Sequence, residues 1–246
     1  MIAKRVLVSL AAAGLVLAAA GAAGAAADKD KSKDKDKGKG KGARGHPVYL
    51  WADSALALGA LNRVLLINFV NTTTTADAVT WFAPLLDEAL RDKPRYAVVD
   101  APQVEREAAT KGIKEDYAVL AGQWKADRSF DPETLKRFAK ALDAQLVMGA
   151  EVSEWLSEQI AWNVEGYSHS DVEVRLRIFS AETGALVWEA RDKVQQKSAH
   201  HDPNAGQAGV VDQLGIQRAQ GQVVPQAPPI DDVAKQVAKN LVSALP

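Results

Sequence analysis

The sequence predicts an α/β fold: a single, three-layer-like domain with a mixed sheet, flanking helices and a C-terminal amphipathic helix. Two observations lead to this prediction. In the first half of the folded region, apolar runs of strand length alternate with helical patterns, which is typical of parallel strands joined by helices. In residues 171–194, two alternating strands flank a short turn, which is typical of an antiparallel hairpin. We therefore expect a sheet that starts parallel and continues with antiparallel hairpins.

The first 27 residues have the pattern of an export signal. Two basic residues precede the apolar run Val6–Leu17, and an Ala/Gly run then ends at Ala27. Small residues before a cleavage point are typical of signal-peptidase sites, so we expect cleavage between Ala27 and Asp28 and a location in the periplasm. The alternative is an uncleaved signal that tethers the protein to a membrane.

Residues 28–47 are expected to form a disordered linker rich in Lys, Asp and Gly. Residues 28–45 contain no large apolar side chain, so burial cannot offset the entropy lost on ordering them. The chain also has no cysteine. This excludes disulfides and thiol chemistry, and it removes the attachment site of a bacterial lipid anchor, so no lipid anchor is expected.

The charge of the chain is unevenly distributed. The first 42 residues hold nine of the 30 basic residues and four of the 31 acidic residues. That leaves 21 bases and 27 acids, a net charge of −6, for Ala43 onward. A folded region this acidic is poorly suited to binding phosphate backbones, so no nucleic-acid partner is expected.

The first predicted strand is Arg63–Val70, a nearly continuous apolar run of the kind found in strands that are covered on both faces. Asn71–Thr75 is a polar turn with good helix-capping residues, and a helix follows to about Asp92. Tyr96–Asp100 is expected to form the second strand, and Val104–Lys111 the next helix.

The second half begins with a helix whose start is well marked. Asp131 is a favourable N-cap, and Pro132 suits the first helical position. A third strand, Leu146–Val152, comes next. In Val172–Ile178 apolar residues alternate with charged ones, which predicts a sheet with one polar face, and Leu186–Ala190 returns after the turn.

The domain is expected to span residues 48–246 and to include an excursion at 195–229 that is rich in Gly, Gln and Pro. The final helix has one apolar face, which must dock on the sheet or on a partner. This face comprises Ile230, Val233, Val237, Leu241, Val242 and Leu245.

One group of residues has the composition of a metal site: His169, His200, His201 and Asp202. Neighbouring histidines bind zinc or copper, but adjacent side chains in a Gly/Pro-rich loop are not held in a preformed geometry, and HExxH-type spacing is absent. We therefore predict a solvated loop, with no metal and no cofactor. Metal or small-ligand binding through this loop stays as the alternative function.

The other polar patterns are explained by structure rather than by catalysis. Asn71–Thr75 follows the carboxyl end of the first strand, where α/β sheets often bind ligands, but it lacks a Gly-rich phosphate fingerprint and helix capping accounts for it. Glu151 interrupts an apolar strand, and alternation can expose it. No GxSxG motif occurs. We predict that the protein is not an enzyme.

Three aromatic residues, Trp155, Trp162 and Tyr167, cluster around a short hairpin outside the predicted core strands. Exposed Trp and Tyr often anchor protein interfaces. Most Trp side chains are largely buried, however, so these residues could instead cover one end of the sheet. Both interpretations stay open from the sequence.

The strands and turns named above resemble a superfamily of bacterial envelope proteins that includes CsgG, LpoB and the N-terminal domain of TolB. The matching phrases are RVLLINFVNTT, YAVVD, LKRFAKALDAQLVMGAEVSEW and VEVRLRIFSAETGALVWEA. The resemblance implies a protein that acts by binding other envelope proteins, as an accessory of secretion or cell-wall synthesis, or that assembles with further copies of itself as a homo-oligomer.

The chain departs from this superfamily in two respects. It lacks the lipobox cysteine. The segments Trp155–Ser170 and Gln195–Pro229 correspond to the lipid-facing hairpins of pore-forming relatives, but neither has the long apolar–polar alternation of a membrane strand. The expectation is therefore a docking domain rather than a pore.

Overall fold

The computed structural model describes residues 49–52, 62–203 and 224–246. The expected signal peptide and linker, and most of the 195–229 excursion, lie outside these residues. The described elements are β1 (Tyr49–Ala52), β2 (Asn62–Asn71), α1 (Ala78–Arg91), β3 (Tyr96–Val99), α2 (Ala101–Thr110), α3 (Lys114–Asp127), α4 (Pro132–Ala141), β4 (Leu146–Glu158), β5 (His169–Ser180), β6 (Leu186–Lys197) and α5 (Ile230–Ser243).

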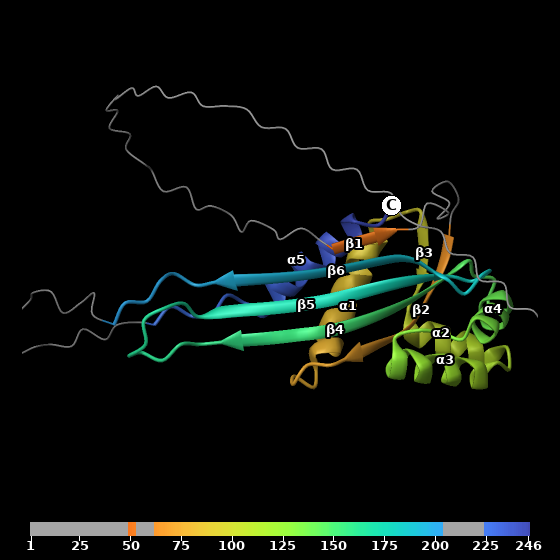
Figure 1. The fold of residues 1–246 in the computed structure, drawn as a ribbon, viewed down its shortest axis with the longest axis horizontal. Helices are drawn as coiled ribbons and strands as arrows, with labels where there is room; N and C mark the ends of the chain where they lie inside the picture. The colour runs from red at the N-terminus through yellow and green to blue at the C-terminus, as the bar shows by residue number, and fades with distance from the viewer. Residues whose placement is uncertain (1–48, 53–61, 204–223) are drawn as a thin grey trace, which may run out of the picture. The chain divides into compact units, whose positions relative to one another are not determined.

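In the described residues, six strands form one sheet in the order β1-β6-β5-β4-β2-β3 (Figure 1). The strand β2 pairs in parallel with β3 and β4, while β4–β5, β5–β6 and β6–β1 are antiparallel. This arrangement confirms the predicted mixed sheet with a parallel start and antiparallel hairpins.

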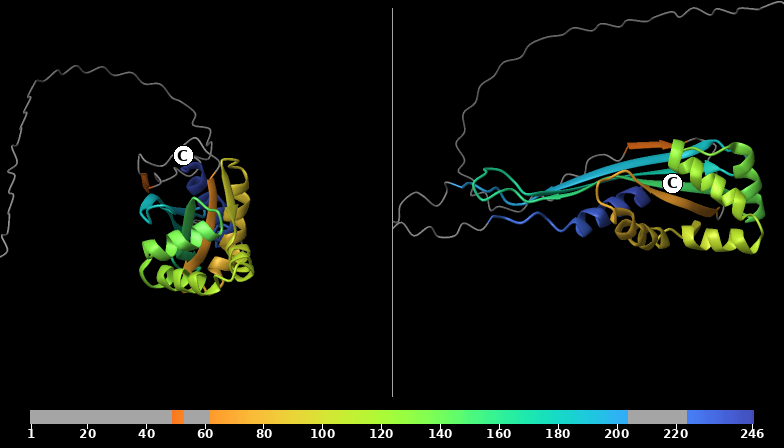
Figure 2. Two further views of the ribbon diagram at one scale, coloured as in Figure 1. Left: turned by 90° about the vertical axis from the view of Figure 1, so that its right-hand side faces the viewer. Right: turned by 90° about the horizontal axis from the view of Figure 1, so that it is seen from below.

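Helices cover both faces of the sheet, which gives the predicted three layers (Figure 2). On one face, α1 and α5 pack against each other and over the sheet, and the apolar face of α5 is buried there as predicted; Val233, Val237 and Leu241 are fully inaccessible. On the other face, α2, α3 and α4 enclose a second apolar cluster.

Trp124 of α3 lies at the centre of this second cluster. Its ring stacks on Phe130 with the centroids 5.5 Å apart, and its Nε1–H donates to the carbonyl of Ala150 at 3.1 Å. Gly149 of β4 faces the ring so closely that a Cβ at this position would overlap it. Glycine therefore makes room for the tryptophan.

The predicted helix start at Asp131 is confirmed, because the Asp131 carboxylate accepts from the Thr134 N–H at 2.9 Å and Pro132 begins α4. The capping interpretation of Asn71–Thr75 is wrong. The helix α1 begins beyond this turn, with Asp77 as N-cap and no side-chain cap bond. Two of the turn hydroxyls instead bond to β4: Thr72 Oγ1 donates to the Val152 carbonyl at 3.2 Å and Thr75 Oγ1 to the Trp155 carbonyl at 3.1 Å.

The strands are longer than predicted. The strand β6 continues to Lys197, three residues into the predicted excursion, and β4 continues to Glu158. The predicted third strand ended at Val152 because β4 has a β-bulge between Val152 and Glu154. The extra residue of the bulge breaks the period-two pattern. The prediction for Trp155 is wrong: this residue lies within β4, beyond the bulge, and its side chain is in the core rather than at a hairpin outside it.

Two elements were not predicted as such. The sequence patterns above give no residue range for the helix α3 or for the short strand β1. None of the helices in the described ranges has the length and apolar character needed to cross a membrane.

Candidate docking surface

The three central strands β4, β5 and β6 continue beyond the strands β1 and β2 that lie on either side of them. The strand β2 pairs with β4 as far as Val152, and β1 pairs with β6 as far as Arg191. Beyond these points, residues 153–158, 169–173 and 192–197 pair with one another (Figure 1). We call these residues the strand extension and the connection 159–168 the tip loop.

The tip loop presents two of the three aromatic residues that the sequence singled out. Trp162 is 74% exposed and Tyr167 is 44% exposed, and Val164 between them is also exposed. Trp155 is only 4% exposed and packs in the core with its ring centroid 6.0 Å from that of Trp81. The structure therefore places Trp162 and Tyr167 on the surface and Trp155 beneath it.

Several contacts hold the tip loop in one conformation. Buried His201 pairs with Gly166 through two backbone hydrogen bonds of 2.8 and 3.0 Å, and its ring Nε2 lies 2.8 Å from the Trp162 carbonyl oxygen. Ser168 Oγ donates to the Pro225 carbonyl at 2.7 Å. The Tyr167 ring meets the ring of His200 edge-on, with centroids 4.9 Å apart. The exposed aromatics thus stand on an ordered support.

The three histidines of the candidate metal group have separate partners. His169 Nε2 lies 3.2 Å from Asp171 Oδ2, whereas His200 Nε2 lies 3.6 Å from Glu165 Oε1 and His201 bonds to a backbone carbonyl. Among the residues that the structure describes, no three His, Cys, Asp or Glu side chains come together as metal ligands. The role of His201 in supporting the tip loop was not predicted, and its pairing with Gly166 depends on tertiary contacts.

One face of the strand extension is polar, as the alternation in β5 predicts. Across this face and the residues next to the strand extension, acidic side chains lie on β4 and basic side chains lie on β6 from Arg191 onward, with both signs on β5 between them. Glu151 of β4 illustrates the pairing: its carboxylate lies 3.0 Å from Arg128 Nε and 3.9 Å from Arg175 Nη1. The acidic column is Glu151, Glu154 and Glu158, and the basic column is Arg191, Lys193 and Lys197.

Glu173 is a largely buried carboxylate on this face, and its surroundings shift its pKa. Burial raises the pKa of Glu173, but hydrogen bonds from Arg191 Nε at 2.5 Å and Ser153 Oγ at 2.9 Å, together with the positive charge of Lys193, outweigh it and hold the pKa below its ordinary value. The charged form of Glu173 therefore stabilises the folded state.

This pKa shift predicts a loss of stability in acid. Because the folded pKa lies below the unfolded value of about 4.5, the stabilisation is complete above that pH and disappears as the pH falls through the folded pKa. Urea unfolding of the wild type between about pH 3 and 7 should show this decline, and Glu173→Gln should flatten it. Glu182→Gln, a change on an exposed turn, is the control. Equal slopes for wild type and Glu173→Gln would contradict the assignment.

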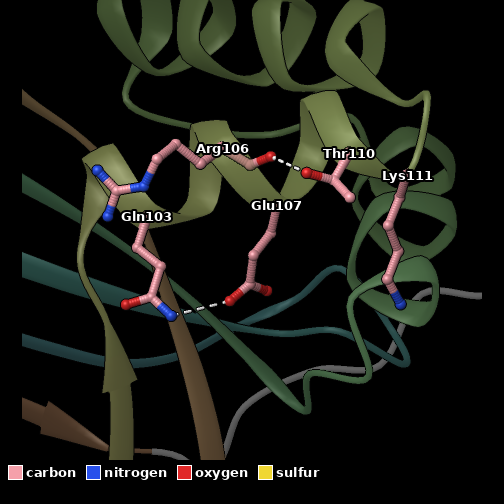
Figure 3. Close-up of a pocket in the computed structure, with 5 residues that line it drawn as sticks. All are labelled: Gln103, Arg106, Glu107, Thr110 and Lys111. Carbon is pink, nitrogen blue, oxygen red and sulfur yellow. Dashed lines mark hydrogen bonds between the residues drawn. The ribbon is translucent and has the colours of Figure 1, made fainter.

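A shallow hollow of about 400 Å³ lies beside α2 (Figure 3). It is lined by residues of that helix and by Lys111, which caps its C-terminal end. Several of its polar groups already have partners in the chain, including Glu107 Oε2, which accepts from Arg63 Nη2 of β2 at 2.6 Å. Gln103 Nε2 donates to Glu107 Oε1 at 3.0 Å, Thr110 Oγ1 donates to the Arg106 carbonyl at 2.9 Å, and Lys111 Nζ donates to the Ala141 carbonyl at 2.8 Å. Because one helix supplies the lining, the hollow does not bring side chains from different elements together.

No family model and no curated protein matches the sequence. Among solved structures, the chain is similar to PelC from Paraburkholderia phytofirmans, described as a dodecamer, at 16% identity over 81% of this chain and 98% of that chain with a TM-score of 0.43. It is also similar to the lipoprotein GNA1162 from Neisseria meningitidis, at 16% identity over 57% and 87% of the two chains with a TM-score of 0.41.

The C-terminal domain of LpoB from Salmonella enterica is a further match, at 15% identity over 56% of this chain and 84% of that chain with a TM-score of 0.37. LpoB is one of the proteins that the sequence phrases resemble. Similarity at these identities and TM-scores does not assign a role, because one fold serves many functions. The role is therefore argued from the surface of this chain.

Proposed function

We propose that the protein is a non-enzymatic accessory of the bacterial cell envelope that docks other envelope proteins through its tip loop. The export-signal pattern and the matching sequence phrases support the envelope location, in the periplasm. The observation that carries the docking role is the exposure of Trp162 and Tyr167 on a loop that hydrogen bonds hold in place.

The energetic argument concerns the exposed indole. Burying a large apolar side chain is favourable by about 1.5–3 kcal/mol of free energy, and a Trp side chain left in water does not gain this stabilisation. Trp and Tyr are also the residues that most often dominate binding energy at protein interfaces. A loop that is already ordered loses little conformational entropy on binding, so more of the burial energy contributes to affinity.

The test is co-purification of the tagged full-length chain from envelope extracts, followed by binding measurements with the purified partner. We expect Trp162→Ala to weaken binding by about 30-fold, equivalent to about 2 kcal/mol, as for a typical interface hot spot. Tyr167→Ala should weaken it less, because the ring is already half covered by its neighbours.

The matched control is Trp51→Ala, which removes another exposed Trp, from β1 rather than from the tip loop. It should bind as the wild type does. The proposal fails if the wild type retains no envelope protein above a tag-only control, or if Trp162→Ala binds as tightly as Trp51→Ala.

A further inference from the structure

The outer edge of β4 is open at Ser157, beyond the residues that β2 and the following turn contact. The carbonyls of Val152 and Trp155 point away from β5, because they accept bonds from Thr72 and Thr75. In an antiparallel pair, alternate residues direct their backbone groups to the same side, so the N–H and C=O of Ser157 also point outward. Within the described ranges, no strand pairs with β4 on this side beyond Val152.

An exposed tryptophan lies beside this edge. Trp81 of α1 is 48% exposed, and its ring contacts that of Trp155, which the bulge turns towards the α1 face of β4. On the opposite face, Leu156 is exposed between Glu154 and Glu158. The Glu154 carboxylate is paired with Lys193 of β6, whereas the Glu158 side chain is 60% exposed and lies 3.8 Å from His169 Nε2. The edge is therefore bordered by an aromatic surface on one face and by carboxylates on the other.

We propose that an extended segment of a partner protein binds here as an additional strand beside β4. Backbone hydrogen bonds to Ser157 supply the pairing, and the two faces of the edge select the side chains. Because side chains alternate along a strand, the favoured segment alternates apolar residues, which pack on Trp81, with basic residues, which face the exposed carboxylate of Glu158. This site is separate from the tip loop.

A second copy of the chain fits this edge less well. The other long open edge of the described chain is β6 beyond Arg191. Its opposite face carries Lys193 and Lys197, which suit the carboxylate side of the β4 edge. On the α1/α5 face, however, Asp192 and Gln196 flank the single apolar residue Val194, so pairing β6 with β4 would place mostly polar side chains where Trp81 offers an apolar surface. The chemistry of the edge therefore favours a foreign segment with alternating apolar and basic residues.

The test uses a short synthetic peptide of alternating Val and Lys, with a Val/Glu peptide for comparison, and follows tryptophan fluorescence of the full chain. We expect the Val/Lys peptide to bind about tenfold more tightly than the Val/Glu peptide. Ser157→Pro should abolish binding, since proline removes the outward N–H while it is tolerated on an edge strand. Ser157→Ala, which keeps that N–H, should bind as the wild type does.

Glu158→Lys provides a second test that does not depend on a proline in the strand. It should weaken binding of the Val/Lys peptide and strengthen binding of the Val/Glu peptide. Trp162→Ala should change neither affinity. The inference is overturned if folded Ser157→Pro binds the peptide normally, or if Glu158→Lys leaves the preference unchanged. It is also overturned if the wild type sediments as an oligomer that Ser157→Pro dissociates, because a second copy then occupies the edge.

Discussion

Replacing Trp124 with alanine should lower the free energy of unfolding by about 3–5 kcal/mol, the usual cost of truncating a fully buried tryptophan. The ring fills the centre of the cluster between α2–α4 and the sheet, stacks on Phe130 and bonds to the Ala150 carbonyl. Its loss leaves a cavity and removes the buried hydrogen bond from the indole to the Ala150 carbonyl. Urea unfolding followed by circular dichroism measures the change.

Gly149 tests the same packing from the opposite side. Gly149→Ala in the wild type should cost about 1–3 kcal/mol, because the new methyl group overlaps the Trp124 ring. In the Trp124→Ala background the same change should cost much less, since the ring is gone. A double-mutant cycle reports this coupling. If the two single effects simply add, Gly149 does not make room for the ring.

Val237→Asp should prevent stable folding. Val237 is fully buried where α5 packs on the sheet and α1, and an isolated carboxylate there loses its hydration without gaining a partner. Circular dichroism and gel filtration of the variant should show an unfolded or aggregated chain. Lys239→Asp introduces the same residue on the exposed side of the same helix and should cost about 0.5 kcal/mol. A cooperative unfolding transition for Val237→Asp near that of the wild type would refute the docking of α5.

The features that the sequence predicted correctly have local causes. Asp131 and Pro132 mark the start of α4 because a cap and a first-turn proline act within a few residues. The apolar face of α5 follows from a 3.6-residue period, and the polar face of β5 at Glu173 follows from a two-residue period.

The incorrect predictions concern positions where a distant contact overrides the local pattern. The bulge after Val152 changes which face of the sheet Trp155 meets, and a two-residue period has no signal for it. The strand β1 is too short to be recognised without its partner β6. Asn71–Thr75 has the composition of a helix cap, but two of its hydroxyls bond to β4, which is distant in the chain.

The candidate docking site was predicted in part. Exposed aromatics at Trp162 and Tyr167 were one of two interpretations of the sequence, and nothing local distinguished them from Trp155. The support from His201 and the open edge at Ser157 had no sequence signal, since both depend on which segments become neighbours.

The sequence by itself determined the class of fold, the polar face of the hairpin strands and the docking face of the last helix, because these depend on residue periods of a few positions. Tertiary structure alone decided which tryptophans are exposed and which backbone groups stay open. Burial and strand pairing are set by contacts between residues far apart in the chain, and no local pattern contains them.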